Sequence, residues 1–341
     1  MKKILCNFVF ILLIGLFILS CGQGGAKSSD QTITMVTDVG GVNDQSFNQS
    51  AWEGLEALAK VNPRVKVNYF ESKTQADYVP YLQNAVDDHA ALIWGVGDKL
   101  GPAVQSVSEL YPDNKFAIVD FSFDPPLPNV SAVLFRVEEA AYLAGYLAAK
   151  VTKTKKIGFI GGFETPIIDN FEYGFRAGVH AADPSVQVFT QYTASFTDSD
   201  KGKSIAQTMA EAGIDIIFPV TGDAGNGAIE LARERNLYVI GVDRDQSYLA
   251  PQNMITSVLK RVDKATENIS SQFLSGEFLP GTRVLGLIDH AVGLAPVNRD
   301  IVTDKALLSE ITGLEQKIIS GEIKIPSLKN EFLSMGYPLN K

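Results

Sequence analysis

The chain has 341 residues, of which 45% are hydrophobic, and this is enough material for two lobes of ordinary domain size. Its formal net charge is −9 at pH 7, and it has no dense run of lysine and arginine. This charge argues against nucleic acid as a polymeric ligand, because binding a phosphate backbone needs a concentrated positive surface. Anionic membrane surfaces would also repel the chain, so membrane attachment is expected to depend on acyl chains rather than on charge.

The N-terminal segment has the pattern of a bacterial secretion signal. Lys2 and Lys3 precede an apolar run over 8–19, and the run closes with Ile18-Leu19-Ser20-Cys21-Gly22, which is typical of a lipoprotein cleavage site. We therefore expect residues 1–20 to be a signal peptide, Cys21 to carry the lipid (palmitate among its acyl chains), and 21–31 to be a polar tether. An uncleaved membrane anchor remains the alternative, although the run is short for a bilayer span.

Removal of this signal changes both charge and cysteine content. Loss of Lys2 and Lys3 lowers the net charge from −9 by two, to −11. The only other cysteine, Cys6, lies in the segment to be removed. The mature chain then has no thiol for a disulfide, a thiolate metal site or a nucleophile, so its core must be held by packing alone.

The rest of the chain alternates between strand-like and helix-like segments. Apolar runs typical of strands occur at 33–36, 65–70, 91–96, 116–119, 157–160, 186–192, 214–220 and 238–242. Helical patterns occur at 51–60, 78–88, 102–110, 137–150, 171–182, 203–212 and 225–235. This alternation predicts parallel sheets covered by helices on both faces. Because the rhythm restarts at Lys155-Lys156-Ile157 after a long helix, we expect two α/β lobes rather than one sheet.

Ligands of such sheets bind beyond the carboxyl ends of the strands, so the residues that follow each strand are candidates. The first strand is followed by the run Asp38 to Gln49, which joins two glycines to the polar side chains of Asn43, Asp44 and Ser46 and to the flat ring of Phe47. A loop of this kind at a helix N-terminus suits a small polar ligand with an aromatic ring.

Later strands end in similar residues: Asp120 after Val119, Thr221, Gly222 and Asp223 after Val220, and Asp243 after Val242. Phe196, in a loop after the strand at 186–192, supplies a second aromatic face. Two phenylalanines from different lobes suit a planar ring, carboxylates suit a vicinal diol or N–H donors, and Gly222 allows close backbone approach.

Each candidate has a structural alternative. An aspartate after a strand is often a helix cap. The alternative for Asp44 or Ser46 is a role only as the cap of the helix at 51–60, and the alternative for Phe47 or Phe196 is a place in a core. Lys260 alone reads as a solvated surface lysine. The prediction rests on the coincidence of these residues at strand ends.

Three motifs together resemble the basic membrane protein family of lipoproteins, which includes purine nucleoside receptors. They are the run from Asp38 to Gly54, Ser195-Phe-Thr-Asp198 with Lys201-Gly-Lys203, and Gly241-Val-Asp-Arg-Asp-Gln-Ser247 followed by Thr256-Ser-Val-Leu-Lys260. The resemblance covers nearly the whole mature chain, and the first motif is highly specific. The family name says basic, whereas this chain is acidic.

The resemblance implies a type I periplasmic binding protein fold, with two doubly wound lobes joined by a three-crossing hinge. Lobe I would comprise 32–150 and about 260–282, and lobe II 151–259 and about 283–341. It also implies a purine nucleoside in the cleft, an ABC transporter permease as partner, no cofactor or metal, a monomer, and a location at the bacterial cell membrane facing the periplasm or the cell surface.

The resemblance further implies roles for individual residues. Phe47 and Phe196 would stack on the base, and Asp243 and Lys260 would hold the ribose hydroxyls, with Lys260 at a hinge crossing where its charge would compensate Asp243. The residues that would bond the base edge or the sugar are Asp38, Asn43, Asp44 and Asp120.

The sequence does not match the catalytic, nucleotide-binding or metal-binding motifs with which it was compared. Gly202-Lys203-Ser204 lacks the first glycine of a phosphate-binding loop, Gly95-Val-Gly97 lacks the third glycine of a dinucleotide fingerprint, and the three histidines have no metal-ligand spacing. An enzyme is therefore not expected. The alternatives that remain open are a receptor for another small solute such as a sugar, and a surface adhesin or antigen.

Overall fold

The computed structural model describes residues 30–339. The expected signal peptide, the lipidated Cys21 and the tether up to residue 29 lie outside the described residues. Strand β1 begins at Gln31, one residue before the predicted start of the first lobe at 32. Within 30–339, no helix combines the length and the apolar composition needed to cross a membrane.

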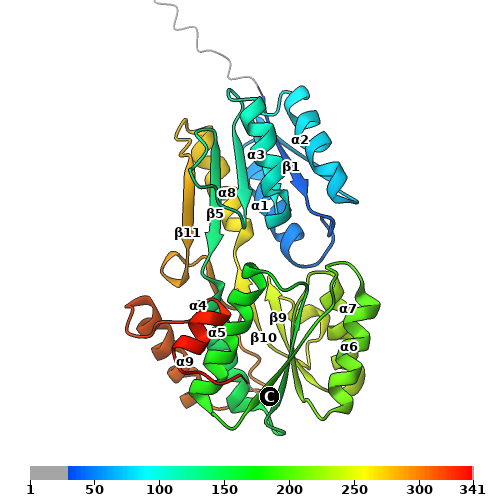
Figure 1. Ribbon diagram of the computed structural model, residues 1–341, viewed down its shortest axis with the longest axis vertical. Helices are drawn as coiled ribbons and strands as arrows, with labels where there is room; N and C mark the ends of the chain where they lie inside the picture. Colours follow the sequence, from blue (N-terminus) through cyan, green and yellow to red (C-terminus); the bar gives the residue numbers. More distant parts are fainter. Residues whose placement is uncertain (1–29, 340–341) are drawn as a thin grey trace, which may run out of the picture. The chain divides into compact units, whose positions relative to one another are not determined.

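The strands form two six-stranded sheets, one in each lobe (Figure 1). The first sheet has the order β11-β5-β4-β3-β1-β2 and is parallel throughout. The second has the order β12-β10-β9-β8-β6-β7 and is parallel except for β12, which pairs antiparallel with β10. The strand bounds are β1 Gln31–Thr37, β2 Val65–Glu71, β3 Leu92–Val96, β4 Phe116–Val119, β5 Val130–Phe135, β6 Lys156–Gly161, β7 Gln187–Tyr192, β8 Ile216–Val220, β9 Tyr238–Asp243, β10 Met254–Lys260, β11 Gly281–Leu285 and β12 Val292–Leu294.

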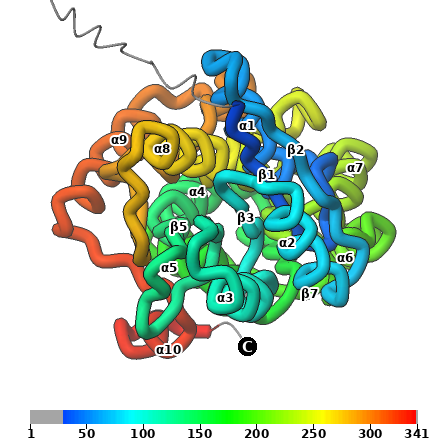
Figure 2. Tube along the Cα trace, turned by 90° about the horizontal axis from the view of Figure 1, so that it is seen from above, coloured from blue at the N-terminus to red at the C-terminus, as the bar shows by residue number. Residues whose placement is uncertain are grey.

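Helices cover both faces of each sheet, as the alternating pattern predicted. Alternate residues of β1 show this: Ile33 and Met35 face the core beneath α1 and α8, while Val36 faces the core beneath α2 and α3. Figure 2 shows the two helix pairs on opposite sides of the first sheet. The helix bounds are α1 Phe47–Val61, α2 Tyr78–Asp87, α3 Gly101–Leu110, α4 Val137–Val151, α5 Pro166–Ala182, α6 Ser199–Glu211, α7 Ala224–Arg235, α8 Val262–Leu274, α9 Lys305–Ile319 and α10 Lys329–Ser334.

The chain passes between the lobes three times, as the predicted fold requires. The crossings are at Arg136 between β5 and α4, at Arg261 between β10 and α8, and at Gly286 between β11 and β12. They are joined by backbone hydrogen bonds: the N–H of Arg136 donates to Leu285, and that of Arg261 donates to Ala291, both at 2.8 Å. The three crossings therefore form one hydrogen-bonded hinge.

Helix α4 packs in the second lobe, whereas the predicted boundary at residue 150 assigned it to the first. A Cβ added to Gly145 would lie 2.1 Å from the carbonyl oxygen of Phe175 in α5, and one added to Gly178 would lie 2.0 Å from that of Tyr142. Only glycine allows the two helix backbones to approach so closely. The crossing comes earlier than predicted because α4 follows β5 with no loop to mark a boundary.

Strands β5, β10, β11 and β12 were not among the strands predicted from the sequence. Two of them, β5 and β10, run directly into the following helix through a single residue, Arg136 or Arg261. Their apolar residues therefore merge with the helical pattern that follows. All four strands adjoin the hinge, and β11 and β12 are short strands of five and three residues.

Candidate ligand-binding site

A cavity of about 70 Å³ lies between the lobes, lined by residues at the carboxyl ends of strands from both sheets. Eight of the nine predicted site residues line it: Asp38, Asp44, Phe47, Asp120, Phe196, Gly222, Asp243 and Lys260. Small-molecule pockets usually measure about 300–1,000 Å³, so a drug-sized ligand would require the lobes or the lining side chains to move. We call this cavity with its lining residues the cleft.

The loop after β1 positions three polar side chains at the start of α1. Asp44 accepts backbone N–H bonds from Ser46 at 2.9 Å, Asn48 at 2.8 Å and Gln49 at 3.1 Å, so it satisfies donors that the helix itself leaves free. Asp44 therefore caps α1, but not only that, because it also lines the cleft. Asp38 accepts from the N–H of Gly40 at 2.9 Å and from the Asn48 amide at 2.8 Å.

Asn43 is the predicted site residue that the structure does not bring into the cleft; its side chain is exposed. Its place is taken by Asn48, whose amide nitrogen bonds both Asp38 and Asp44 and whose buried amide oxygen has no partner in 30–339. The sequence signal for Asn48 was its position four residues after Asp44, on the first turn of α1, where it faces the same ligand space.

Asp120 and Asp243 occupy equivalent positions at the carboxyl end of the third strand of each sheet: Asp120 follows β4 directly, and Asp243 is the last residue of β9. Both have left-handed backbone conformations, with φ of 67° and 66°. Non-glycine residues adopt this conformation at a cost of about 1–3 kcal/mol, which persists where the surrounding structure enforces it. Aspartate tolerates this conformation better than most residues do, and both of these aspartates line the cleft.

Lys260 is buried, with 2% of its surface exposed. Its ammonium forms a hydrogen-bonded ion pair with Asp120 across the lobes, and it lies 4.8 Å from the ring centroid of Phe47 and 5.4 Å from that of Phe135. Asp243 instead accepts a hydrogen bond from Ser46 in the other lobe. Lys260 thus neutralises the charge of Asp120 by direct contact and acts on Asp243 only through space. The sequence-based expectation was that Lys260 would compensate Asp243. The second Asp120 oxygen is buried and has no partner in the described chain.

Burial shifts the pKa of several cleft carboxyls upward. Desolvation raises the pKa of Asp38 to about 6 against the lowering effect of its bonds to Gly40 and Asn48. Desolvation also raises the pKa of Asp243 to about 6, against the attraction of Lys260. The pKa values of Asp44 and Asp98 are raised for the same primary reason.

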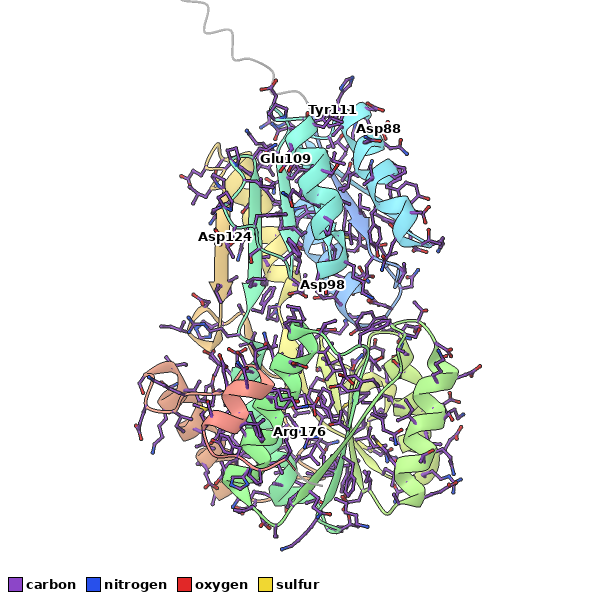
Figure 3. All side chains as sticks on the ribbon, in the orientation of Figure 1. Asp88, Asp98, Glu109, Tyr111, Asp124 and Arg176 are labelled. Atoms are coloured by element: carbon purple, nitrogen blue, oxygen red, sulfur yellow. The ribbon has the colours of Figure 1, made fainter. Side chains whose placement is uncertain are left out.

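Five aspartates line the cleft against one lysine, Lys260. The fifth, Asp98, was not predicted, although it follows β3 closely and the strand-end rule applies to it; Figure 3 shows it at the end of the first lobe that faces the second. Among the described residues, no group of three or more His, Cys, Asp and Glu side chains is arranged to hold a metal ion. The cleft therefore offers an excess of hydrogen-bond acceptors.

The two predicted aromatic faces come from different lobes. Phe47 begins α1 in the first lobe, and Phe196 belongs to the second, where its ring packs edge-on against Phe163 with centroids 5.0 Å apart. Gly162 makes this arrangement feasible, because a Cβ there would lie 2.1 Å from the Phe196 ring. Lys99 from the first lobe lies 3.7 Å from the Phe163 ring centroid and so extends the contact between the lobes.

Further contacts join the lobes beside the cleft. Arg244 binds both carboxylate oxygens of Glu53, at 2.8 and 3.1 Å. The Gln246 amide donates to the backbone carbonyl of Gln45 at 3.0 Å, and the Tyr248 hydroxyl donates to the Gln45 side chain at 3.2 Å. We call these five residues the seam; they hold the lobes together without lining the cleft.

Comparison with known proteins agrees with this geometry. Residues 31–329 match the Bmp family model, described as ABC transporter substrate-binding protein PnrA-like. The chain belongs to the Bmp family. It is 40% identical to the CD4+ T-cell-stimulating antigen of Listeria monocytogenes, over 93% of this chain and 96% of that protein. It is 36% identical to Basic membrane protein D of Borreliella burgdorferi, over 93% and 94%.

Solved structures confirm the fold class. An ABC transporter solute-binding protein from Aeropyrum pernix superimposes with a TM-score of 0.82 at 26% identity, over 89% of this chain and 96% of that chain. The fold is the type I periplasmic binding protein fold. This Bmp chain is thus a substrate-binding protein of an ABC transporter, from a family of solute-binding proteins rather than enzymes. Its solute is a small molecule, and its partner is a permease.

Proposed function

We propose that the chain binds purine nucleosides in the cleft and delivers them to an ABC permease. The observation that carries this proposal is that two phenylalanines from different lobes, Phe47 and Phe196, line one cavity together with five carboxylates. Aromatic rings favour a planar base, and carboxylates accept hydrogen bonds from ring N–H, amino and ribose hydroxyl donors.

The ribose is assigned to the side of the cleft formed by Asp243 and Lys260. A carboxylate and an ammonium together accept from and donate to a vicinal diol. The base edge is assigned to Asp38, Asp44 and Asp120, joined by Asn48, with Gly222 allowing the backbone to approach. The unpartnered oxygens of Asp120 and Asn48 support this assignment, because a ligand with N–H or O–H donors would satisfy them.

Charge restricts the ligand to nucleosides rather than nucleotides. The cleft lining carries five aspartates and one lysine, so a phosphate group would face repulsion and would meet a cation already paired with Asp120. A neutral nucleoside meets no such penalty.

In the proposed mechanism, ligand enters between open lobes, and closure brings Phe47 and Phe196 onto the base. Closure also forms the bond between Ser46 and Asp243 and the contacts of the seam. Because the closed state contacts the ligand from both lobes, the ligand binds that state more tightly and shifts the equilibrium toward it. The permease would then receive the closed form.

The proposal includes a membrane location. Lipid on Cys21, after removal of residues 1–20, would hold the monomeric receptor at the bacterial cell membrane, facing the periplasm or the cell surface. The name Basic membrane protein of the relatives supports this location. Globomycin, which blocks lipoprotein signal cleavage, should leave a heavier precursor, and a Cys21→Ser variant should not incorporate palmitate.

Isothermal titration of the chain lacking residues 1–21, refolded to remove carried-over ligand, tests the ligand. The panel is adenosine, guanosine, inosine, adenosine monophosphate, uridine, adenine and ribose. We expect saturable one-to-one binding of purine nucleosides, with the nucleotide and ribose at least tenfold weaker. Tight binding of a sugar with no response to nucleosides would assign the site to another solute class, and silence from every ligand in folded protein would favour the adhesin or antigen alternative.

A further inference from the structure

We propose that a second cavity, on the hinge and separate from the cleft, binds a small organic anion and that its occupancy is linked to the angle between the lobes. The cavity measures about 530 Å³ and is lined by α8, β11 and the segment at 289–291. Of the described residues, none lines both this cavity and the cleft. Its volume lies within the range of about 300–1,000 Å³ usual for small-molecule sites.

The central observation is Arg283, which lines this cavity and belongs to β11, the edge strand of the first sheet. Figure 1 shows the position of β11 at that edge. Its side chain is half-buried, and within residues 30–339 it has no carboxylate partner and no hydrogen-bond acceptor. The other arginines in 30–339 that are not exposed are each bonded to a carboxylate: Arg176 to Glu172, Arg244 to Glu53 and Arg261 to Asp263.

An unpaired and partly desolvated guanidinium is unfavourable, and desolvation lowers the pKa of Arg283. An anion in the cavity would remove this cost. The planar fork of arginine is best matched by a carboxylate or a phosphate, which can accept two parallel N–H bonds.

The neighbours of Arg283 support an anion. Arg261 and Lys264 also line the cavity, while the carboxylates that pair with them, Asp263 and Glu267, do not. The basic member of each ion pair therefore borders the cavity, and the acidic member does not. The single acidic side chain in its lining is Asp289, which accepts the backbone N–H of Gly286 at 2.9 Å.

Two further features define the rest of the ligand. Gln272 lines the cavity, and its side-chain oxygen is buried with no partner in the described chain, so a rotation of this side chain would let it accept a bond from a hydroxyl or amino group of an occupant. Ile269, Leu279 and Leu285 supply an apolar wall. The chemistry that fits is one anionic group, an adjacent hydroxyl or amino donor, and a short aliphatic part.

The position of the cavity on the hinge is the reason for the link to lobe angle. Its lining includes Arg261 and Ala291, which belong to two crossings and are joined by a backbone hydrogen bond of 2.8 Å. The remaining wall, α8 and β11, belongs to the first lobe. Rotation of the lobes changes the backbone at the crossings, so it changes the cavity, and by linkage an occupant changes the rotation.

Calorimetric titration of the full chain in detergent, at constant ionic strength in chloride, tests the binding with three probes. They are 2-hydroxyisocaproate, its uncharged amide, and inorganic phosphate. We expect saturable binding of the hydroxy acid, with the amide and phosphate at least tenfold weaker. Equal binding of the acid and the amide, or binding of phosphate alone, would overturn the proposed ligand chemistry.

Two variants separate the site from unspecific charge. Arg283→Gln removes the unpaired charge and should weaken binding of the hydroxy acid at least tenfold, while the melting temperature without ligand stays the same or rises. Arg299→Gln changes an exposed arginine outside the cavity and should leave binding unchanged. Wild-type affinity in the Arg283 variant would refute the site.

Small-angle scattering tests the link to lobe angle. Saturating hydroxy acid should change the radius of gyration of the wild type and not that of Arg283→Gln. Binding without any such change would overturn the linkage. None of these measurements uses a nucleoside, so failure of this proposal and failure of nucleoside binding are distinguishable.

Discussion

The two halves of the molecule share one strand order but carry different residues at equivalent positions, and the difference locates the polar centre of the cleft. In the first half β5 leads into α4 through Val133-Leu134-Phe135-Arg136-Val137. In the second half β10 leads into α8 through Val258-Leu259-Lys260-Arg261-Val262. The crossing arginines have nearly the same backbone, with φ, ψ of −83°, 63° at Arg136 and −77°, 61° at Arg261. The halves differ at Phe135 and Lys260.

A scaffold that repeats itself therefore places an apolar ring at one position and a buried ammonium at the other. Asp120 and Asp243 show the opposite relation, because both halves keep the aspartate and its left-handed backbone. Lys260 is the single lysine near these two carboxylates, and it forms its ion pair with Asp120 rather than with Asp243. We infer that asymmetry between the halves, rather than the shared scaffold, determines what the cleft binds.

The largest expected effect comes from removing the lysine by which the halves differ at this position. Lys260→Met leaves the buried Asp120 without its cation and should destabilise the fold by about 3 to 5 kcal/mol, measured by urea denaturation at pH 7. The double variant Asp120→Asn with Lys260→Met should recover most of this stability, since no unpaired charge remains. Both variants should lose nucleoside binding, because both lack Lys260.

A double variant as unstable as Lys260→Met alone would show that packing around Phe47 and Phe135, and not charge pairing, keeps Lys260 in place. Asn43→Ala, at the exposed asparagine outside the cleft, is the matched control and should leave both stability and binding unchanged.

The two aromatic residues of the cleft, one from each lobe, should contribute unequally to nucleoside binding. Phe47→Ala should weaken nucleoside binding by about 2 to 4 kcal/mol, because the ring lies in the closed cleft and also against Lys260. Phe196→Ala should cost less, since Phe163 packs against it and would partly fill the space. Titration calorimetry of both variants against adenosine and guanosine checks this order, and unchanged affinity in both would refute the stacking assignment.

The raised carboxyl pKa values predict how stability depends on pH. Asp38 and Asp243 have pKa values of about 6 in the folded state, above those of the unfolded chain. The folded state thus binds more protons between pH 4 and 6, so these groups should make stability fall as pH rises through that window. Each shift of about two pKa units corresponds to roughly 3 kcal/mol.

Asp243→Asn should therefore be more stable than the wild type at pH 7 and equally stable near pH 4, while its nucleoside binding is weakened. Chemical denaturation at several pH values checks the slope. A variant with the wild-type slope would assign the pH dependence to other carboxyls.

Much of this geometry was predictable from the sequence, because strand ends are easy to recognise. Asp120, Asp243 and Gly222 follow apolar runs whose period and length predict parallel strands, and parallel strands bring their carboxyl ends together. The same rule, applied to β3, would have found Asp98. The cleft lining is in this sense a direct consequence of the alternation of strands and helices.

Two parts of the structure were beyond the sequence pattern. The choice between Asn43 and Asn48 depends on the path of the loop, which turns through left-handed residues at Gly41 and Gln45, with φ of 69° and 55°, and these turn Asn43 outward. Strands β5 and β10 were missed because a single residue, Arg136 or Arg261, separates strand from helix. Local patterns do not encode either feature.

The smallest expected effect lies at the seam, where contacts join the lobes without lining the cleft. Arg244→Ala removes the ion pair with Glu53, whose side chains are 22% and 41% exposed, and such pairs contribute about 1 kcal/mol or less. Because the pair joins the lobes and so favours closure, its loss should weaken nucleoside binding by at most about fivefold and leave the melting temperature nearly unchanged.

Removing Glu53 as well distinguishes closure from other causes. If the pair acts only by favouring the closed state, Glu53→Ala and the double variant should each match Arg244→Ala in affinity, and added salt should abolish the difference from the wild type. Lys203→Ala, which removes ion pairs to Glu230 and Glu234 within the second lobe, is the control and should not change affinity. Additive losses in the double variant would mean that Arg244 and Glu53 act on ligand binding separately and not through their ion pair.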